Sequence, residues 1–438
     1  MPDAIRTRRQ GLQAALLSCL ISLAAAAPVS QSRHTPPAAG PQQETPAGRE
    51  YRAGIQALVN GDLAAAQAKF EAVLKGASDD VPALLGLAAV HQARKAPSTA
   101  ESYLRRAERV QPSAPEVLLA RGRYQLGQGD TAGAEKAIRA AVDADPGKLP
   151  PLLELGDLLM RSPQRKAEAL SVFRQAVAAH PGNAYAQYGL GLSAAVNSQR
   201  EEAQAALERA AALRPKDPSA LQAIGQLQLE AGAVDKALAA FDGGLLRQPK
   251  SVPLMMHRAD ALLRAGRGQE ALVQLQAAES LVPKAAAVKL KLGEVYLSAG
   301  RPGEAEAQFL EALKLDAKNP LAYNNLAWMT VERKGDLKQA VAWARQAVSL
   351  APKASAFHDT LGWAERAAGN LAGAVTSLQR AVELDPQVAG YHYHLGVVQS
   401  ENKQLAESRA SLKRALELDP RMPDAGKAQA LLSSLAPG

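Results

Sequence analysis

The chain has 438 residues, of which 51 are Lys or Arg and 43 are Asp or Glu, so its formal net charge is +8 at pH 7. Apolar residues make up 47% of the sequence but aromatic residues only 4%; most of the apolar mass is Ala, Leu and Val, and both Ala and Leu are strong helix formers. The charges are interspersed, with no run of five like charges and no basic stripe with interleaved aromatic residues. This distribution argues against nucleic-acid binding and indicates solvated helix faces.

The N-terminal segment has the order of a secretory signal peptide. Three arginines within residues 6–9 precede an apolar run over residues 12–27 that ends in four alanines. The run is too short and too rich in Ala for a membrane-spanning helix. We predict a signal peptide over residues 1–26, because a cut after Ala27 would leave Pro28 at the new terminus. The chain is therefore expected to be exported, to the periplasm or the cell envelope.

Two features of this segment leave the export route and the fate of its cysteine open. Residues 7–12 resemble a twin-arginine export motif, with Gly11 at the position that Phe often holds. Residues 16–19 resemble a lipobox, in which Cys19 would become an acylated N-terminus and the chain's only contact with a membrane. The alternative is that Cys19 is a small residue of an apolar run that continues past it. Because Cys19 is the only cysteine, the rest of the chain has no disulfide and no thiol chemistry.

A linker is predicted over residues 27–46. This stretch is rich in Pro and Gln and holds almost no apolar residues. A segment of that composition lacks the apolar surface to fold by itself, so we expect it to be flexible and extended.

From about residue 47 the chain repeats itself every 34 or 35 residues, which is the signature of a repeat architecture. The residues that close the units are Ser78, Pro112, Pro146, Pro181, Pro215, Pro249, Pro283, Ala317, Pro352, Pro386 and Pro420. Proline at this place ends one helix and starts the next turn. The pattern predicts eleven units over residues 47–422.

Small residues occupy two further positions of each unit. Position eight is always Gly or Ala, and twelve or thirteen residues later the chain has Ala, or Ser408 in the last unit. Two helices of a hairpin cross closely only where neither carries a bulky side chain, so we predict that these positions face each other. The two 35-residue units keep both positions, which places their extra residue in the turns near residues 161–163 and 333–335. Bulkier residues are expected one helical turn beyond the second position: Phe70, Phe173, Phe241 and Phe309.

This pattern of Leu or Ile with Gly, then Ala, a bulky apolar residue, Ala and Pro resembles the tetratricopeptide repeat. The resemblance covers residues 47–422 and implies an all-α fold, a right-handed superhelical solenoid of about eleven helical hairpins. Residues 423–438 are predicted to form a C-terminal capping helix and a tail, which would cover the apolar face of the last unit. In this family the first helix of each hairpin lines a concave groove, chiefly through positions 2, 5, 9, 12 and 13.

The resemblance selects candidate groove residues in units five, six, seven, nine, ten and eleven. They are Tyr185, Tyr188, Gln222, Gln226, Asp260, Arg264, Asn324, Trp328, Asp359, Trp363, Arg366 and Tyr393. Aromatic faces beside amide and carboxylate groups suit an extended peptide or a sugar chain. Two interpretations remain open for Trp328 and Trp363, which either contact a ligand or fill the seam between repeats. Trp343 stands on a second helix and is expected to pack in the core or on the convex side.

The C-terminal third has a narrower resemblance. Residues 324–328, 336–337, 359–363 and 393–396 are similar to the closing repeats of bacterial envelope proteins from exopolysaccharide and PEP-CTERM sorting loci, many of which are lipoproteins. The chain is shorter than typical members. The resemblance implies a role in exopolysaccharide export or envelope assembly.

Signals for catalysis, cofactors and metals are weak. His392 and His394 are two residues apart on a predicted helix and so point away from each other, and no third ligand stands nearby. The glycines recur at repeat spacing, so they are packing sites and not a phosphate-binding loop. We therefore predict no catalytic residue, no metal and no cofactor, and a non-enzymatic scaffold that holds a protein or peptide partner in its groove. The alternative is a protein that binds exopolysaccharide through an aromatic groove.

Overall fold

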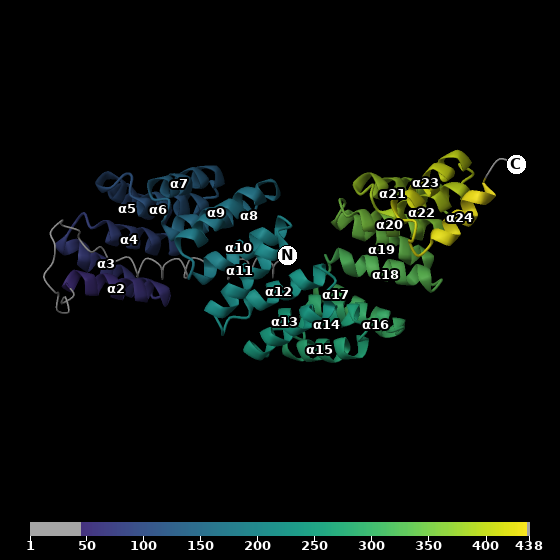
Figure 1. Ribbon diagram of the computed structural model, residues 1–438, viewed down its shortest axis with the longest axis horizontal. Helices are drawn as coiled ribbons and strands as arrows, with labels where there is room; N and C mark the ends of the chain where they lie inside the picture. The colour runs from purple at the N-terminus through teal and green to yellow at the C-terminus, as the bar shows by residue number, and fades with distance from the viewer. Residues whose placement is uncertain (1–44, 436–438) are drawn as a thin grey trace. The chain divides into compact units, whose positions relative to one another are not determined.

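The computed structural model describes residues 45–435, and within them the fold is all-α, as predicted (Figure 1). The described residues hold 23 α-helices and no strand, arranged as eleven hairpins and one further helix. The first helices of the hairpins are α2 (Pro46–Val59), α4 (Val81–Ala93), α6 (Pro115–Gly127), α8 (Leu149–Met160), α10 (Ala184–Val196), α12 (Ser219–Glu230), α14 (Val252–Arg264), α16 (Ala286–Ser298), α18 (Pro320–Glu332), α20 (Ser355–Ala367) and α22 (Ala389–Glu401). The second helices are α3 (Leu63–Gly76), α5 (Pro97–Val110), α7 (Thr131–Ala144), α9 (Lys166–Ala179), α11 (Arg200–Leu213), α13 (Val234–Arg247), α15 (Gly268–Leu281), α17 (Pro302–Leu315), α19 (Leu337–Leu350), α21 (Leu371–Leu384) and α23 (Leu405–Leu418).

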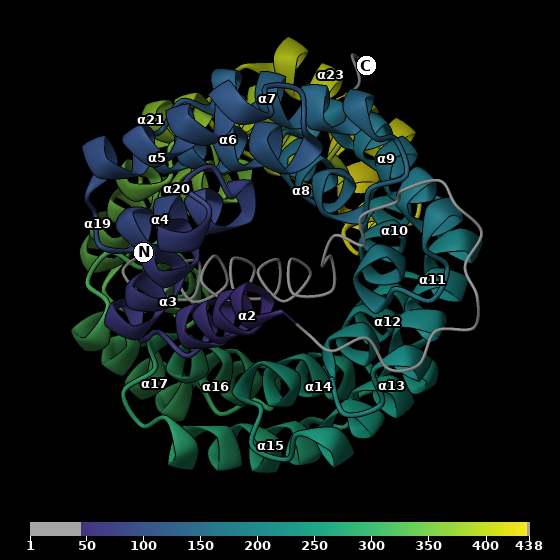
Figure 2. The same cartoon turned by 90° about the vertical axis from the view of Figure 1, so that its left-hand side faces the viewer.

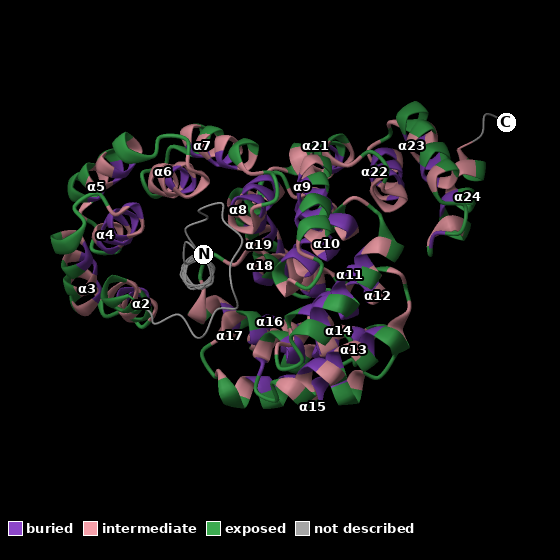
Figure 3. Cartoon of the chain, turned by 60° about the vertical axis from the view of Figure 1, so that its left-hand side comes forward, coloured by how far each residue is buried: buried purple, intermediate pink, exposed green. Residues whose placement is uncertain are grey.

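The described residues divide into two compact units between Leu227 and Gln228, inside α12. In the N-terminal unit, Figure 2 shows α4, α6 and α8 on the inner side and α5, α7 and α9 on the outer side. Burial follows the same division. Eight residues of α4 are buried but only three each of α3 and α5, a contrast that is visible in Figure 3. α4 is therefore covered on several faces by its neighbours, whereas α3 and α5 keep one face in solvent.

The predicted crossing of small residues is present in the structure. In the first hairpin, Ala66 is fully buried, and a Cβ atom added to Gly54 would lie 2.7 Å from the ring of Phe70. The same ring also lies against the next hairpin, since a Cβ atom added to Gly86 would be 2.7 Å from it. Phe173 repeats this arrangement between the glycines of α8 and α10. In these two places one phenylalanine of a second helix thus fills a gap that glycine opens in two successive first helices.

Ser408 replaces alanine in the last hairpin and is also fully buried. Its hydroxyl donates a hydrogen bond of 2.7 Å to the carbonyl oxygen of Gly396. Because the bond satisfies the buried hydroxyl, the crossing keeps its close approach without alanine.

The turn inside the hairpins has a shared backbone conformation that was not predicted. Among the described residues, position fifteen has a positive φ in every unit except the fourth. Six of these residues are glycine, which adopts this conformation without steric cost, and the others are Lys95, Ser198, Lys334 and Lys403. In the fourth unit a 3-10 helix, Pro163–Arg165, takes the place of the left-handed residue. The extra residue of the two longer units lies in these turns, as predicted.

The last hairpin is covered by α24 (Ala425–Ser434). Ala428 of α24 and Met422 before it are buried with Leu412 and Ala415 of α23. The helix therefore closes the apolar end of the repeat, as the sequence predicted.

Candidate functional site

Four candidates of units nine to eleven, Trp328, Asp359, Trp363 and Tyr393, lie around one histidine in the C-terminal unit. The imidazole of His394 stacks on the indole of Trp363, with ring centroids 4.3 Å apart and an angle of 28° between the planes. The indole of Trp328 lies 6.4 Å from the same imidazole. Three successive first helices, α18, α20 and α22, thus contribute to one group of side chains. We call Trp328, Asp359, Trp363, Arg366 and His394 the tryptophan cluster.

The polar groups of the tryptophan cluster have partners inside the protein. Oδ1 of Asp359, which is buried, lies 2.8 Å from Nδ1 of His394. The guanidinium of Arg366 stands 4.4 Å from the centroid of the Trp363 ring and pairs with both carboxylate oxygens of Glu401, at 2.9 and 2.5 Å. Trp363 therefore contacts an imidazole and a guanidinium that are both held in place. These contacts favour the interpretation that Trp363 fills the seam between repeats.

Trp328 and Asn324 have fewer internal partners. Trp328 is half-buried at the edge of the cluster. One helical turn before it, the Oδ1 atom of Asn324 is buried and has no hydrogen-bond partner among the described residues. A buried acceptor without a hydrogen bond destabilises the fold, so a ligand that donates a hydrogen bond to this oxygen would remove that free-energy cost.

Tyr393 lies on the other side of His394, toward the capping helix. It is buried, and burial is the main cause that raises the pKa of its hydroxyl, followed by the charge of Asp424. Tyr393 and His394 together line a cavity of about 330 Å³ whose other walls include Asp419, Met422 and Asp424.

The polar candidates of the seventh unit, Asp260 and Arg264, bond residues of the eighth and the sixth unit respectively. Nζ of Lys291 lies 2.9 Å from Oδ1 of Asp260 and 2.9 Å from Oε2 of Glu294. Burial opposes the charge of Lys291, but these two carboxylates outweigh it and raise the pKa of the lysine. Arg264 donates a hydrogen bond of 3.0 Å to the carbonyl oxygen of Leu229. Asp260 and Arg264 thus hold neighbouring repeats together.

The remaining candidates belong to the N-terminal unit. Tyr185 is 44% exposed, and with Tyr188 it lines a cavity of about 110 Å³. The guanidinium of Arg214 lies 5.0 Å from the centroid of the Tyr185 ring and pairs with Asp217 at 3.0 Å. Burial, and after it the charge of Asp217, raises the pKa of Tyr188.

Gln222 and Gln226 are half-buried on α12, near the boundary between the units.

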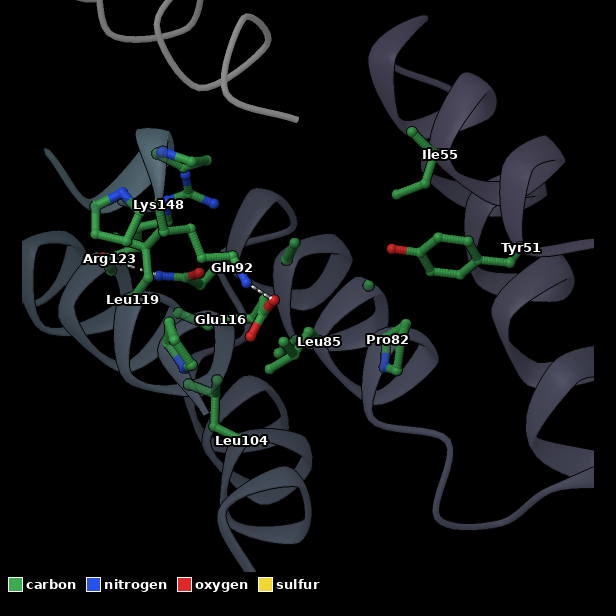
Figure 4. A pocket seen from close by; sticks show the side chains of 17 residues that line it. Tyr51, Ile55, Pro82, Leu85, Gln92, Leu104, Glu116, Leu119, Arg123 and Lys148 are labelled. Carbon is green, nitrogen blue, oxygen red and sulfur yellow. Dashed lines mark hydrogen bonds and ion pairs between the residues drawn. The ribbon is translucent and has the colours of Figure 1, made fainter. Parts of the chain in front are cut away.

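Sequence reasoning missed a second groove in the N-terminal unit. Tyr51 and Ile55 of α2 form one side of it, and Leu85 of α4 and Leu119 of α6 form the other (Figure 4). These four residues hold positions five and nine of the first three units, the same positions that selected candidates from the fifth unit onward. Applied to the first three units, the rule would have found this groove. We call the groove lined by Tyr51, Ile55, Leu85, Ala89 and Leu119 the N-terminal groove.

Charged groups at one end of the N-terminal groove are paired with each other. Lys148 and Glu116 form an ion pair there, and Arg123 forms another with Glu154. The amide of Gln92 donates to the backbone oxygen of Arg123 at 3.4 Å. Since each charge has an opposite neighbour, this groove differs from the tryptophan cluster in presenting mainly apolar surface.

The two histidines at i and i+2 take separate partners. Nε2 of His392 lies 3.0 Å from the carbonyl oxygen of Pro386, whereas His394 bonds Asp359. Within residues 45–435, no group of three His, Cys, Asp or Glu side chains is arranged to hold a metal ion.

Trp343 packs half-buried against core residues of α17 to α19, as expected. Among the described helices, none has both the length and the apolar composition needed to cross a membrane. The predicted signal peptide, Cys19 and all but the last two residues of the predicted linker lie outside the described residues.

Comparisons with known proteins agree with the repeat architecture. Two family models, both described as tetratricopeptide repeat, match residues 92–148, 153–199, 197–255, 256–320, 290–355 and 360–423. These matches cover more than half of the chain, which therefore belongs to the tetratricopeptide repeat family. Proteins of this family bind protein or peptide partners, and the repeat is typically a non-enzymatic interaction scaffold.

No curated protein matches the chain. Among solved structures, the chain is similar to the APC/C hetero-tetramer Cut9–Hcn1, with 14% identity, 90% of this chain and 97% of that chain covered, and a TM-score of 0.50. It is also similar to yeast Tom70, with 15% identity, 89% and 95% coverage, and a TM-score of 0.51. At these identities the likeness shows the fold alone.

Proposed function

We propose that this protein is an adaptor of the bacterial periplasm or cell envelope that holds a protein partner against the first helices of its C-terminal unit. The observation that carries the proposal is that Trp328 stands one helical turn after Asn324 on α18, at the edge of the tryptophan cluster. A half-buried indole offers apolar contact area, and the buried, unpartnered Oδ1 of Asn324 would gain a backbone N–H donor if the bound chain displaced the groups that cover it. An extended peptide supplies both groups in regular alternation.

The proposed location and pathway rest on sequence features alone. Residues 1–26 have the composition of an export signal, and the closing repeats resemble envelope proteins of exopolysaccharide loci. We therefore place the adaptor in exopolysaccharide export or envelope assembly, held to the membrane by a lipid on Cys19 if the lipobox is used. The similar fold of Cut9, which was crystallised in a hetero-tetramer with Hcn1, fits a scaffold that assembles with other proteins.

Affinity capture from solubilised envelopes tests the partner. Wild-type chain is compared with Trp328→Ala and with Asn324→Ala, and Leu246→Ala, whose side chain on α13 is 85% exposed, is the matched control. We expect one protein that wild type and the control retain and that both cluster variants lose. Equal capture by all four chains, or capture of no protein by wild type, would overturn the proposal.

Direct carbohydrate binding is the second candidate, and the stacked rings of the tryptophan cluster beside a buried carboxylate favour it. A variant with Trp343→Phe keeps only Trp328 and Trp363, both in the tryptophan cluster, as tryptophans. If the host's exopolysaccharide binds at the cluster, its addition should change the emission of these two indoles in a saturable way. A flat titration eliminates this candidate and leaves the protein-partner proposal untouched.

A further inference from the structure

The N-terminal groove is built for an apolar occupant. Its sides are formed by Tyr51 and Ile55 on α2 and by Leu85, Ala89 and Leu119 on α4 and α6. Because the ion pairs at its end neutralise each other, it offers no unpaired charge to a polar or ionic ligand. Apolar surface of this kind is the usual mark of a binding site.

The same chain carries an apolar run that is tethered next to this groove. Thirteen of the sixteen residues 12–27 are apolar, and 17 residues separate Ala27 from Thr45, whose side chain caps α2. Tyr51 and Ile55, on the wall of the groove, are six and ten residues further on, which is about 9 to 15 Å along a helix. A random-coil chain of 17 residues has an r.m.s. span of roughly 25 Å, so a segment of this length is long enough to reach the groove.

From these two observations we infer that the uncleaved chain occupies its own N-terminal groove with residues 12–27. A tether of this length gives the run an effective concentration in the millimolar range, well above that of any free competitor. Removal of residues 1–26 then leaves the groove vacant. This last step rests on the proposed export, whereas occupation of the groove in the full chain does not.

Photocrosslinking in the full chain tests the occupation. A photoreactive phenylalanine replaces Leu17, and the crosslinked residues are identified by mass spectrometry. We expect crosslinks within one chain to Tyr51, Leu85 or Leu119. Ala89→Asp, which places a charge inside the groove, should abolish them. Ala140→Asp, at a half-buried position of α7 outside the groove, should leave them intact.

Competition in solution provides an independent reading. A labelled peptide of residues 6–27 is titrated into the full chain and into a full chain with Leu16→Asp and Leu17→Asp. We expect the peptide to bind the second chain at least about tenfold more tightly, because its groove is vacant. The inference fails if the two affinities are equal, if crosslinks join two chains, or if they fall outside the groove. None of these results tests export. Export is tested separately, by identifying the N-terminal residue of the mature protein.

Discussion

Asp359 and His394 are joined by a contact of 2.8 Å between Oδ1 and Nδ1, although they stand one repeat and one residue apart in the sequence. The contact ties α20 to α22, and the carboxylate is buried. His394 also stacks on Trp363. The histidine therefore serves the packing of two repeats at once, and its removal would leave a buried carboxylate without this partner.

We expect His394→Ala to destabilise the C-terminal unit by about 2–3 kcal/mol, because an unsatisfied buried carboxylate is costly. All three tryptophans belong to this unit, so urea unfolding followed by indole emission reports on it alone. In the double variant Asp359→Ala, His394→Ala the cost should be smaller than the sum of the two single costs. Strict additivity would contradict an energetic coupling between the two residues.

Gly189→Ala is expected to destabilise the N-terminal unit by about 1–3 kcal/mol, since its Cβ would overlap the ring of Phe173 in a filled core. Gly182→Ala is the matched control, because an added Cβ there meets nothing within 4 Å. Thermal unfolding followed by far-ultraviolet circular dichroism measures both. Adding Phe173→Leu to Gly189→Ala should restore part of the lost stability; a further loss would mean that the ring is not the obstacle.

The repeat register, the crossing of small residues and the capping helix were predictable because each is a local pattern that recurs at fixed spacing. The role of Phe70 was predicted in part. Its contact with Gly54 lies within one hairpin, whereas its contact with Gly86 belongs to the next one. A sequence pattern within one repeat unit does not predict contacts between residues of successive hairpins.

The tryptophan cluster illustrates the same limit. His394 holds position six of its unit, where Gly86 and Gly189 stand in theirs, and position six was not among the groove positions. Its importance comes from Asp359 and Trp363, which belong to the preceding repeat. The N-terminal groove differs, because its residues Tyr51, Ile55, Leu85 and Leu119 stand at groove positions five and nine of the first three units and were therefore predictable from the sequence.

Position fifteen of each hairpin offers a test of the turn. Ser198 has a φ of 61°, a conformation that costs an L-residue about 1 kcal/mol or more and that glycine adopts freely. Ser198→Gly should therefore stabilise the N-terminal unit by about 0.5–1 kcal/mol. Gly129→Ala, at the equivalent turn with a φ of 83°, should destabilise it by a similar amount. If the left-handed conformation of the turn is the cause, Ser198→Gly must raise the melting temperature and Gly129→Ala must lower it. Two shifts of the same sign would contradict this cause.

A closed network of four charges joins α7 to α9 and predicts a dependence on pH. Glu135 lies 2.6 Å from Arg165 and 2.9 Å from Arg139, and both arginines also pair with Glu168. The hydrogen bond from Arg165, assisted by that from Arg139 against the opposing effect of burial, lowers the pKa of Glu135 from 4.5 to about 2. The extra residue of the fourth unit lies in the turn that carries Arg165, so the longer turn and the ion network occur at the same place.

A carboxyl whose pKa is lower in the folded chain stabilises the fold above the unfolded pKa, and the gain disappears as the pH falls through the folded pKa. Glu135→Gln should therefore cost about 1–2 kcal/mol at pH 7, after allowance for screening by solvent. The difference between wild type and variant should shrink between pH 5 and pH 2 and vanish below it. Glu306→Gln, which breaks a single exposed pair with Arg333, is the control and should change stability by less than about 0.5 kcal/mol at any pH. A constant difference across this range would show that Glu135 acts through its shape and not through its charge.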